Sequence, residues 1–590
     1  MMARPVANSA LMLCTLMALA ACGGGDSAGS TNEPVQIGAT PTPSPTPTPS
    51  PTPTPPASTA PAQTATGQMV LGVQTHFSQG WGLDSLDKSD DIGTRLLRDE
   101  MPWSFGEETK GAIAFTDATA QKLDSTCDRG FQLILTQIPT HDAYDGGSFA
   151  YTPEAQSAFA KYVKAVADRW GDCIVAFEIG NEINGGNQLS FPSGYDPDET
   201  VVALMKAVHD AVKPSHPGIA LLGGSTNMIG TGFQKNLFDA GMLKYVDGVA
   251  VHPYSRHADG LPLELAKLRS TIESYGSDAE IWATEFGHDT PDFAEAAAQT
   301  LKSVTLMSAA DVDVAVWYAL LEEQWYPNFG LYSGGTKRPI AHTIDFAQRS
   351  LLTRGRAEQV DVGDDMVFAY RFGTDATVVW GAPQTLSVSG ATAVYDYKGQ
   401  ALSSSTSVEI SPRPVVIMGD IAIRTGSSGM VADTVMQYGR DAWQYFARNA
   451  DGAYDELGYR SRWYDSLFMS DWDGTLALKA TGGVPARTGA DPMRVVWRYT
   501  APKAMQVTAM SCFAKSSNGD GIDVSISRNG SVSTSEIVSS GERTLRTDLS
   551  LSEGDRVEFI VGPNQTYGGD DFSFRGRIYL QGQAGSVACP

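Results

Sequence analysis

Two glutamate residues that end short apolar segments are the strongest candidates for chemistry in this sequence. Glu182 ends FEIGNE (residues 177–182), and Glu285 lies near the end of IWATEFG (residues 281–287). Cleavage of a glycosidic bond needs such a pair, because one carboxyl group protonates the departing oxygen while the other attacks or assists at the anomeric carbon. Either glutamate alone fits an ordinary surface or salt-bridged residue. The pair is informative only if the fold brings both to one place.

Eight strand-like stretches alternate with helix-like stretches across residues 69–320, the part of the chain that holds both glutamates. The strand candidates are short and rich in apolar residues, which is typical of strands buried on both faces of a parallel sheet. They cover residues 70–77, 94–99, 131–138, 174–181, 219–225, 248–254, 280–286 and 312–319. Between them, apolar residues recur three and four positions apart, as expected for helices with one buried face.

Eight such units within about 250 residues predict an α/β protein built on a (β/α)8 barrel, or TIM barrel. A doubly wound open sheet is the alternative, but no G-x-G-x-x-G motif follows the first strand candidate. Barrel enzymes carry their chemistry at the C-terminal ends of the strands. Since Glu182 ends the fourth candidate and Glu285 the seventh, we expect both carboxyl groups at the same rim.

Glutamates at the ends of strands four and seven resemble the catalytic pair of glycoside hydrolase clan A, the retaining (β/α)8 glycosidases. RDEMPW (residues 98–103) resembles the second-strand segment whose arginine hydrogen-bonds the nucleophile. VHPY (residues 251–254) resembles the sixth-strand segment whose histidine and tyrosine flank the nucleophile. Trp317 matches the aromatic platform on strand eight, below the bound sugar.

The segment NFGLYSGGTKRP (residues 328–339) resembles the clan's exit from the barrel, so the resemblance covers roughly residues 69–425. It is nearest to glycoside hydrolase family 39, which includes hydrolases of bacterial exopolysaccharide. One departure is that INGG follows Glu182, where Pro-Asn or Pro is common.

The resemblance implies double displacement with Glu285 as the nucleophile and Glu182 as the acid/base. Arg98 and the hydroxyl of Tyr254 should hold Glu285 ionised, because a cation and a donor stabilise a carboxylate. We expect Glu182 to begin protonated, with its pKa raised by partial burial and by the charge of Glu285. Retention requires the two carboxyl groups to lie about 5–5.5 Å apart.

Further residues near the strand ends are candidates for binding substrate. Asn181 should hydrogen-bond the sugar 2-hydroxyl, although capping the strand-end turn is an alternative role. His252 should orient the site, or it is a satisfied core residue. Aromatic candidates for stacking on sugar faces, or for the core, are Trp103, Trp317, Trp325 and Tyr326. Other subsite candidates are His76, Gln137, His141 and His288.

The N-terminal residues 1–21 are typical of a signal peptide, with Arg4 before a short apolar run. The run ends in LAAC and is followed by three glycines, which resembles the bacterial lipobox and predicts lipidation of Cys22; an ordinary secretory signal is the alternative. Gly23 after the cysteine favours the outer membrane. We therefore expect a cell-envelope protein whose only membrane contact is its lipid anchor.

A linker and two β-rich regions complete the expected organisation. Residues 22–67 form the lipidated and Pro/Thr-rich linker, whose repeated prolines favour extended polyproline II. The catalytic barrel should span residues 68–342. A β-sandwich side domain is expected over residues 343–425, and a jelly-roll-like sandwich over residues 430–590. The last is either a carbohydrate-binding module or a stabilising domain.

The aromatic residues of this last region could form a sugar-binding face or its core: Tyr438, Trp443, Tyr445, Trp463 and Trp472. Four cysteines are candidates for two disulfides, Cys127–Cys173 and Cys512–Cys589, with free thiols as the alternative. Because no C-x-x-C or His-x-x-x-His spacing occurs, the sequence predicts no metal site.

The chain has 43 Lys and Arg against 67 Asp and Glu, a formal net charge of −24. So acidic a protein repels phosphate backbones, which argues against a nucleic-acid partner. We expect a monomer without cofactors that acts on a polysaccharide or oligosaccharide as a retaining β-glycoside hydrolase. A transglycosylase with the same residues and a noncatalytic carbohydrate-binding lipoprotein are the alternatives.

Overall fold

The structure is a computed structural model that describes residues 67–254, 257–470, 475–488 and 491–590. The predicted signal peptide, Cys22 and all but the last residue of the linker lie outside these residues, as does Trp472. Among the described residues, none of the helices has the length and apolar character needed to cross a bilayer.

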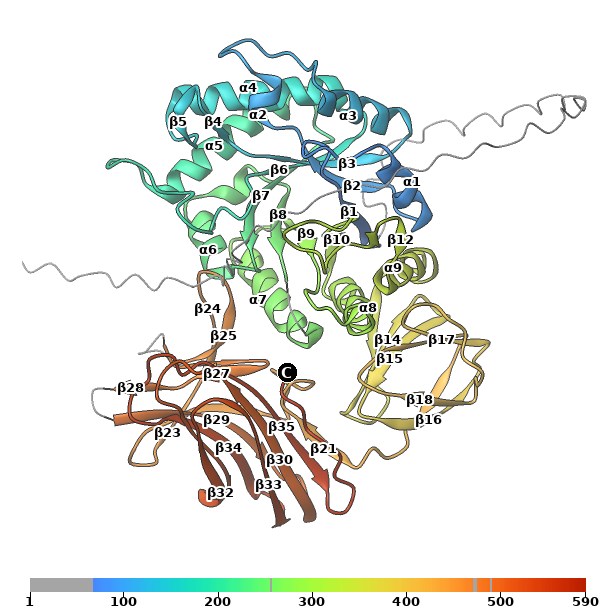
Figure 1. Cartoon of the computed structure of the whole chain (residues 1–590), viewed down its shortest axis with the longest axis vertical. Helices are drawn as coiled ribbons and strands as arrows, with labels where there is room; N and C mark the ends of the chain where they lie inside the picture. The colour runs from blue at the N-terminus through green and yellow to red at the C-terminus, as the bar shows by residue number, and fades with distance from the viewer. Residues whose placement is uncertain (1–66, 255–256, 471–474, 489–490) are drawn as a thin grey trace, which may run out of the picture. The chain divides into compact units, whose positions relative to one another are not determined.

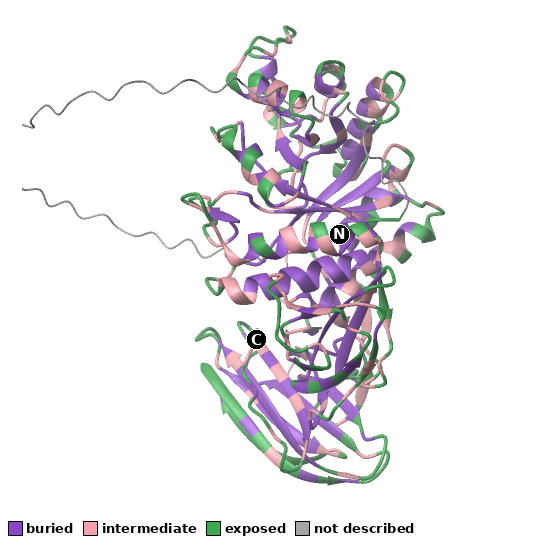
Figure 2. Cartoon of the chain, turned by 90° about the vertical axis from the view of Figure 1, so that its right-hand side faces the viewer, coloured by how far each residue is buried: buried purple, intermediate pink, exposed green. Residues whose placement is uncertain are grey.

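Eight parallel strands close into a barrel in the order β1-β10-β9-β8-β7-β6-β3-β2, which confirms the predicted (β/α)8 fold (Figure 1). The strands are β1 (Val70–Gln74), β2 (Leu96–Glu100), β3 (Gln132–Gln137), β6 (Ile174–Ile179), β7 (Ala220–Asn227), β8 (Gly248–His252), β9 (Glu280–Phe286) and β10 (Val312–Trp317). Figure 2 shows them as buried, because side chains fill the barrel and helices cover its outside.

Four of the surrounding helices begin at a residue whose side chain caps the helix. Thr152 accepts a hydrogen bond from the amide of Ala155 and precedes a proline, and Asp196 accepts from the amides of Asp198 and Glu199. The main helices are α1 (Asp84–Asp91), α3 (Ala118–Asp128), α4 (Pro153–Trp170), α5 (Pro197–Val212), α6 (Thr231–Asp239), α7 (Leu261–Ser274), α8 (Phe293–Ala309) and α9 (Pro339–Ser350). The short elements are α2 (Trp103–Gly106) and the hairpin β4 (Thr140–His141) and β5 (Tyr144–Phe149).

After α9 come two antiparallel sheets, ordered β13-β14-β15-β19-β17 and β18-β16-β20, that share an apolar core. Their strands are β13 (Ala357–Val360), β14 (Val367–Phe372), β15 (Ala376–Gly381), β16 (Gln384–Ser389), β17 (Ala393–Asp396), β18 (Ser407–Ile410), β19 (Val415–Met418) and β20 (Ala422–Arg424). The sheets form the expected small sandwich.

The C-terminal region forms a second sandwich from a larger pair of antiparallel sheets, with paths β24-β25-β26-β27-β35-β30-β33 and β23-β22-β29-β34-β31-β32. Off these paths, β21 (Met430–Asp433) pairs with β35, and β28 (Ala486–Thr488) pairs with β29. The first path holds β24 (Gly458–Ser461), β25 (Ser466–Met469), β26 (Ala477–Lys479), β27 (Gly482–Val484), β30 (Met505–Lys515), β33 (Gly541–Leu551) and β35 (Phe572–Leu580). The second holds β22 (Gln444–Arg448), β23 (Tyr454–Glu456), β29 (Asp491–Thr500), β31 (Ile522–Arg528), β32 (Ser531–Val538) and β34 (Arg556–Pro563).

An Asn529-Gly530 turn joins β31 to β32, with positive φ at both residues as a primed hairpin turn requires. Tyr438, Trp443 and Tyr445, weighed as a sugar-binding face or core, are core residues that are 3–5% exposed.

Both expected disulfides pair in the structure. Cys127 in α3 joins Cys173 just before β6, with a Cα–Cα distance of 5.6 Å. Cys512 in β30 joins Cys589 at a Cα–Cα distance of 5.0 Å, which ties the C-terminal tail to the second sandwich.

Candidate active site

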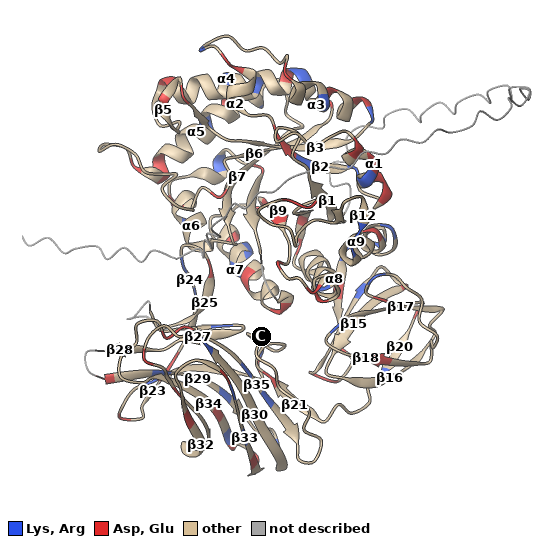
Figure 3. Ribbon diagram, viewed as in Figure 1, with Lys and Arg blue, Asp and Glu red and all other residues tan. Residues whose placement is uncertain are grey.

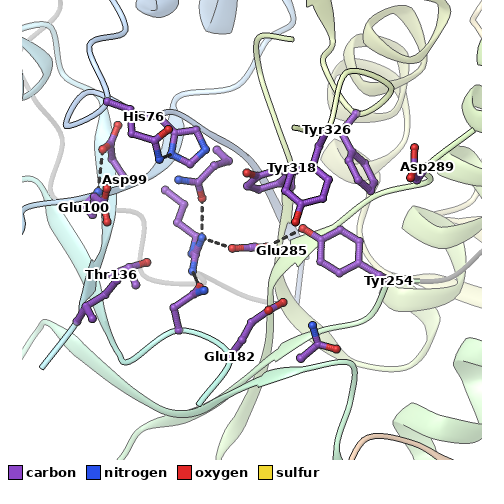
Figure 4. Close-up of a pocket in the computed structure, with 17 residues that line it drawn as sticks. His76, Asp99, Glu100, Thr136, Glu182, Tyr254, Glu285, Asp289, Tyr318 and Tyr326 are labelled. Carbon is purple, nitrogen blue, oxygen red and sulfur yellow. Dashed lines mark hydrogen bonds and ion pairs between the residues drawn. The ribbon is translucent and has the colours of Figure 1, made fainter. Parts of the chain in front are cut away.

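A cavity of about 480 Å³ opens at the C-terminal ends of the barrel strands (Figure 4). Side chains at or just after the strand ends line it: Gln74, Arg98, Asp99, Glu100, Thr136, Asn181, Glu182, Asn227, Tyr254, Glu285 and Tyr318. Each barrel strand thus contributes to one polar site, which is the arrangement that the fold favours.

The two glutamates converge in this cavity. One carboxylate oxygen of Glu182, one of Glu285 and a ring nitrogen of His252 lie within 4.8 Å of one another. Glu182 reaches this position through a tight turn, because Gly180 has φ +87 and Glu182 itself has φ 48. A Cβ atom at Gly180 would lie 2.5 Å from a methyl group of Ile183, so only glycine fits there.

Arg98 links the nucleophile candidate to the barrel interior. Its Nη1 donates to Glu285 Oε1 at 2.6 Å and to Gln74 Oε1 at 2.7 Å. Its Nη2 donates to Asn181 Oδ1 at 2.8 Å, and its Nε to Glu178 at 2.6 Å. The guanidinium group is 3% exposed, so it is a structural cation whose nitrogens are already engaged.

Tyr254 provides the second donor to Glu285, with its hydroxyl 2.6 Å from Oε2 (Figure 4). Burial, and then the neighbouring charge of Glu285, raise the pKa of Tyr254 well above its usual value. The phenol therefore stays protonated and keeps donating. Glu285 thus has a charged donor on one oxygen and a phenol on the other, which suits an ionised carboxylate.

Glu178 is a site residue that the sequence interpretation missed. It is fully buried below Glu182 and accepts hydrogen bonds from Arg98, Ser225 and Thr284. Burial opposes its charge, but Arg98 and then His252 outweigh burial and hold the pKa of Glu178 far below its usual range. A glutamate inside the apolar run IVAFEI was the available signal.

His252 is fully buried among three carboxylates. Its Nδ1 lies 3.2 Å from Glu182 Oε1 and 3.5 Å from Glu285 Oε2, and its Nε2 lies 3.3 Å from Glu178 Oε1. Burial lowers its pKa, but the charge of Glu285 and hydrogen bonds to Glu178 and Glu182 raise it overall to about 9. His252 is therefore a cation at neutral pH.

The positive charge of His252 contradicts the prediction that Glu182 begins protonated with a raised pKa. Burial is the largest influence and raises the pKa of Glu182, but the hydrogen bond and charge of His252, followed by a hydrogen bond from Asn227, lower it overall. The free site therefore keeps its proton on His252, next to the acid/base candidate, rather than on Glu182. The sequence interpretation considered the charge of Glu285 but gave His252 none.

A metal ion fits this cluster poorly. The donor atoms of Glu182, His252 and Glu285 are close enough to share one ion. Both ring nitrogens of His252, however, are already engaged, because Nδ1 lies 3.2 Å from Glu182 Oε1 and Nε2 lies 3.3 Å from Glu178 Oε1.

The structure corrects two of the aromatic predictions. Trp103 is 2% exposed, donates from Nε1 to Glu107 at 2.7 Å and does not line the cavity. Trp317 is fully buried and donates to the carbonyl oxygen of Phe329. Since successive strand residues face opposite sides, the following residue, Tyr318, lines the cavity instead.

Of the remaining predicted substrate-binding residues, some line the cavity and others do not. Tyr326 and His76 line the cavity, and Nε2 of His76 lies 2.6 Å from Glu323 Oε1. Trp325 is 79% exposed and is not among the lining residues. Gln137, His141 and His288 are buried and do not line the cavity either.

Asp99 gives the site a pH-dependent effect on stability. It is fully buried and accepts hydrogen bonds from Thr75, Phe77 and Glu100. Burial nevertheless raises the pKa of Asp99 to about 7, compared with 3.8 in an unfolded chain. Because the folded state binds this proton more tightly, the stabilisation is fully present below pH 3.8 and is lost as the pH rises through 7.

Asp99→Asn removes this titration. We expect the free energy of unfolding of the variant, relative to the parent, to increase by about 2–3 kcal/mol between pH 5 and pH 8. Denaturant titrations across this range measure the change. Asp278→Asn, at an exposed position, is the control and should show a constant difference. A constant difference for Asp99→Asn would contradict the assignment.

Two solved structures of glycoside hydrolases are similar to this chain. A family 39 glycoside hydrolase from the gut symbiont Bacteroides cellulosilyticus WH2 has a similar structure, with a TM-score of 0.51 and 18% sequence identity over 60% of this chain and 81% of that chain. A family 39 β-xylosidase from Caulobacter crescentus aligns with a TM-score of 0.44 and 16% identity, over 60% and 97% of the two chains.

No family model matches the sequence, and neither does any curated protein. The first structural likeness establishes the fold. This fold is the (β/α)8 barrel that the resemblance of the motifs implied.

Proposed function

We propose that the chain is a retaining glycoside hydrolase that cleaves β-glycosidic bonds of a polysaccharide or oligosaccharide by double displacement. One observation carries the proposal: Glu182 and Glu285 enter the same cavity with carboxylate oxygens within 4.8 Å of each other. So short a separation suits direct attack by one carboxylate, since inverting enzymes hold the two groups about 6.5–9.5 Å apart to admit water. The assembled set of Arg98, Asn181, His252 and Tyr254 supports an active site over a noncatalytic barrel.

In the first step Glu285 attacks the anomeric carbon while Glu182 gives a proton to the departing oxygen. His252 supplies the proton that Glu182 needs, because its Nδ1 lies 3.2 Å from Glu182 Oε1. Substrate binding displaces water from Glu182, which makes its charged form less favourable and shifts the shared proton toward it. The buried ion pair of Arg98 and Glu178 keeps both of its charges during this step.

In the second step water replaces the enzyme at the anomeric carbon. Bond formation has removed the charge of Glu285, the strongest influence that raises the pKa of His252. Glu182 then acts as the base that takes a proton from water, and cleavage restores the carboxylate of Glu285. Asn181, whose Oδ1 accepts from Arg98, has its amide N–H groups left for the sugar 2-hydroxyl.

The charges around the cavity favour a neutral sugar at the cleavage point. The described lining residues include two cationic or potentially cationic groups, Arg98 and His76, and both are already paired with carboxylates. The acidic lining residues are Asp99, Glu100, Glu182, Glu285 and Asp289. A uronic acid would bring its carboxylate to this acidic surface without a free cation to receive it.

A glycoside panel followed by proton NMR tests the proposal. We expect release of the β-anomer first from β-linked neutral glycosides or oligosaccharides, because two inversions give net retention. Matched β-uronides should react at least tenfold more slowly, a loss that corresponds to about 1.4 kcal/mol. First appearance of the α-anomer would exclude double displacement, and transfer to an added sugar acceptor would identify a transglycosylase.

We further propose that the chain is anchored in the bacterial envelope through Cys22, on the strength of the LAAC motif and the Pro/Thr-rich linker.

Figure 3 shows Lys and Arg scattered among Asp and Glu over the described ribbon. Together with the net charge of −24, this distribution supports a partner other than nucleic acid.

A further inference from the structure

The hairpin of β24 and β25 in the C-terminal sandwich ends in a closed tip, residues 462–465. The amide of Arg462 donates to the carbonyl oxygen of Asp465 at 2.7 Å. The Arg462 guanidinium also binds the Asp465 carboxylate through two nitrogens, at 2.9 and 3.1 Å. These bonds hold the tip in one shape, with Trp463 and Tyr464 between the paired residues.

This tip binds the barrel at the start of α6. The amide of Gly230 donates to the carbonyl oxygen of Tyr464 at 3.0 Å, and the amide of Gly232 donates to that of Arg462 at 2.9 Å. No side chain caps α6, so the hairpin carbonyls accept N–H groups that the first turn of a helix leaves without partners. The indole of Trp463 packs edge-on against Phe233, with 4.8 Å between ring centroids.

The same tip reaches the loop that carries Glu182. Trp463 Nε1 donates to the backbone carbonyl oxygen of Asn184 at 2.7 Å. The buried Asn184 side chain is bonded twice to Asn227, since its Nδ2 donates to the carbonyl oxygen at 3.1 Å and its Oδ1 accepts from the amide at 2.8 Å. Asn227 in turn lines the cavity together with Glu182 and lowers the pKa of its carboxyl group.

We propose that the hairpin tip of the C-terminal sandwich positions the acid/base Glu182 through Asn184 and Asn227. Glu182 has φ 48, a backbone conformation that a non-glycine residue keeps only when its surroundings hold it there. The tip fixes the loop two residues beyond Glu182 and the helix start that follows Asn227. Trp463 is therefore a positioning residue, and this role rests on the proposed function of Glu182.

Trp463→Phe tests the link, because it keeps an aromatic ring against Phe233 and removes the N–H group that binds Asn184. General acid catalysis contributes about 10²–10⁴-fold, so we expect partial misplacement of Glu182 to lower kcat/KM about tenfold for glycosides with poor leaving groups. Dinitrophenyl glycosides, which need no proton for departure, should change less than twofold.

Gly232→Ala tests the docking from the barrel side. Its Cβ atom would lie 2.3 Å from the carbonyl oxygen of Arg462, so the hairpin must move away, whereas alanine is tolerated well within a helix. Gly218→Ala is the matched control, since its Cβ atom meets nothing within 4 Å and its φ is not positive. We expect the first variant to show the same leaving-group dependence as Trp463→Phe, and the control to behave as the parent.

Hydrogen exchange of the full chain separates this inference from the proposed function. In Trp463→Phe and in Gly232→Ala, amides of residues 180–187 and 226–230 should exchange faster, while those of the β9 and β10 strands stay protected. Unchanged exchange in these two loops would overturn the inference whatever the activity. Equal rate losses for good and poor leaving groups would also overturn it, because they indicate general damage. Faster exchange without hydrolysis of any glycoside by the parent would instead reject the proposed function alone.

Discussion

Glu285→Ala is expected to lower kcat/KM at least a thousandfold for any glycoside that the parent hydrolyses. The side chain that forms the covalent bond is removed, so the first displacement loses its nucleophile. Arg98 keeps its hydrogen bonds to Glu178, Gln74 and Asn181, so the barrel retains a paired cation at this point. Steady-state kinetics with the parent's best substrate measure the loss, and the melting temperature reports on the fold.

Azide provides the control for this variant. The small anion can occupy the space left by Glu285 and attack the anomeric carbon of an activated β-glycoside. A single displacement should then give the α-glycosyl azide, with inverted configuration, and restore turnover. A folded Glu285→Ala protein that retains the parent's rate would reject Glu285 as the nucleophile.

Glu182→Ala is expected to separate substrates by their leaving groups. Glycosides with poor leaving groups should lose about 10²–10⁴-fold in kcat/KM, because they depend on proton donation. Dinitrophenyl glycosides should keep most of their first-step rate and accumulate the glycosyl-enzyme, since no base then activates water. Burst kinetics and intact-protein mass spectrometry measure this accumulation.

Azide distinguishes this variant from the preceding one by stereochemistry. It should accelerate breakdown of the glycosyl-enzyme and yield the β-glycosyl azide, with the substrate's configuration retained, because Glu285 still performs the first displacement. The α-azide from Glu182→Ala would mean that the two roles are exchanged. Uniform loss for all leaving groups would remove Glu182 from the role of acid.

Local patterns predicted the barrel because every repeat carries its own signals. Short apolar runs and amphipathic stretches alternate within a few tens of residues, and the strand bounds differ from the prediction by only a few positions. In the side domain, the apolar runs at β14, β15, β17 and β19 are equally clear signals in the sequence. The strands β16 (QTLSVS) and β18 (SVEI) give a weaker signal, because alternate polar residues reduce their apolar character.

Site residues whose place depends on their position along a strand could be predicted from the sequence. Properties that depend on neighbouring side chains from other segments could be predicted less well. Glu182, Glu285, Arg98 and Tyr254 follow from strand ends. The charge of His252 arises from three carboxylates, two from β6 and the turn after it and one from β9, so no local motif encodes it.

Choosing Tyr318 over Trp317 requires the rotation of β10 about its axis, because a one-residue difference reverses the side that a side chain faces. The docking of Trp463 on Asn184 joins residues 279 positions apart and has no signal in either segment.

That separation has a consequence for biogenesis. The barrel with its two glutamates precedes the hairpin at residues 458–469 along the chain, and domains generally fold as units. Under the proposed link, a barrel that has folded before the sandwich holds an unsupported acid/base loop until the hairpin docks. A truncated product that ends before residue 458 would therefore hold bound sugars poorly aligned for cleavage.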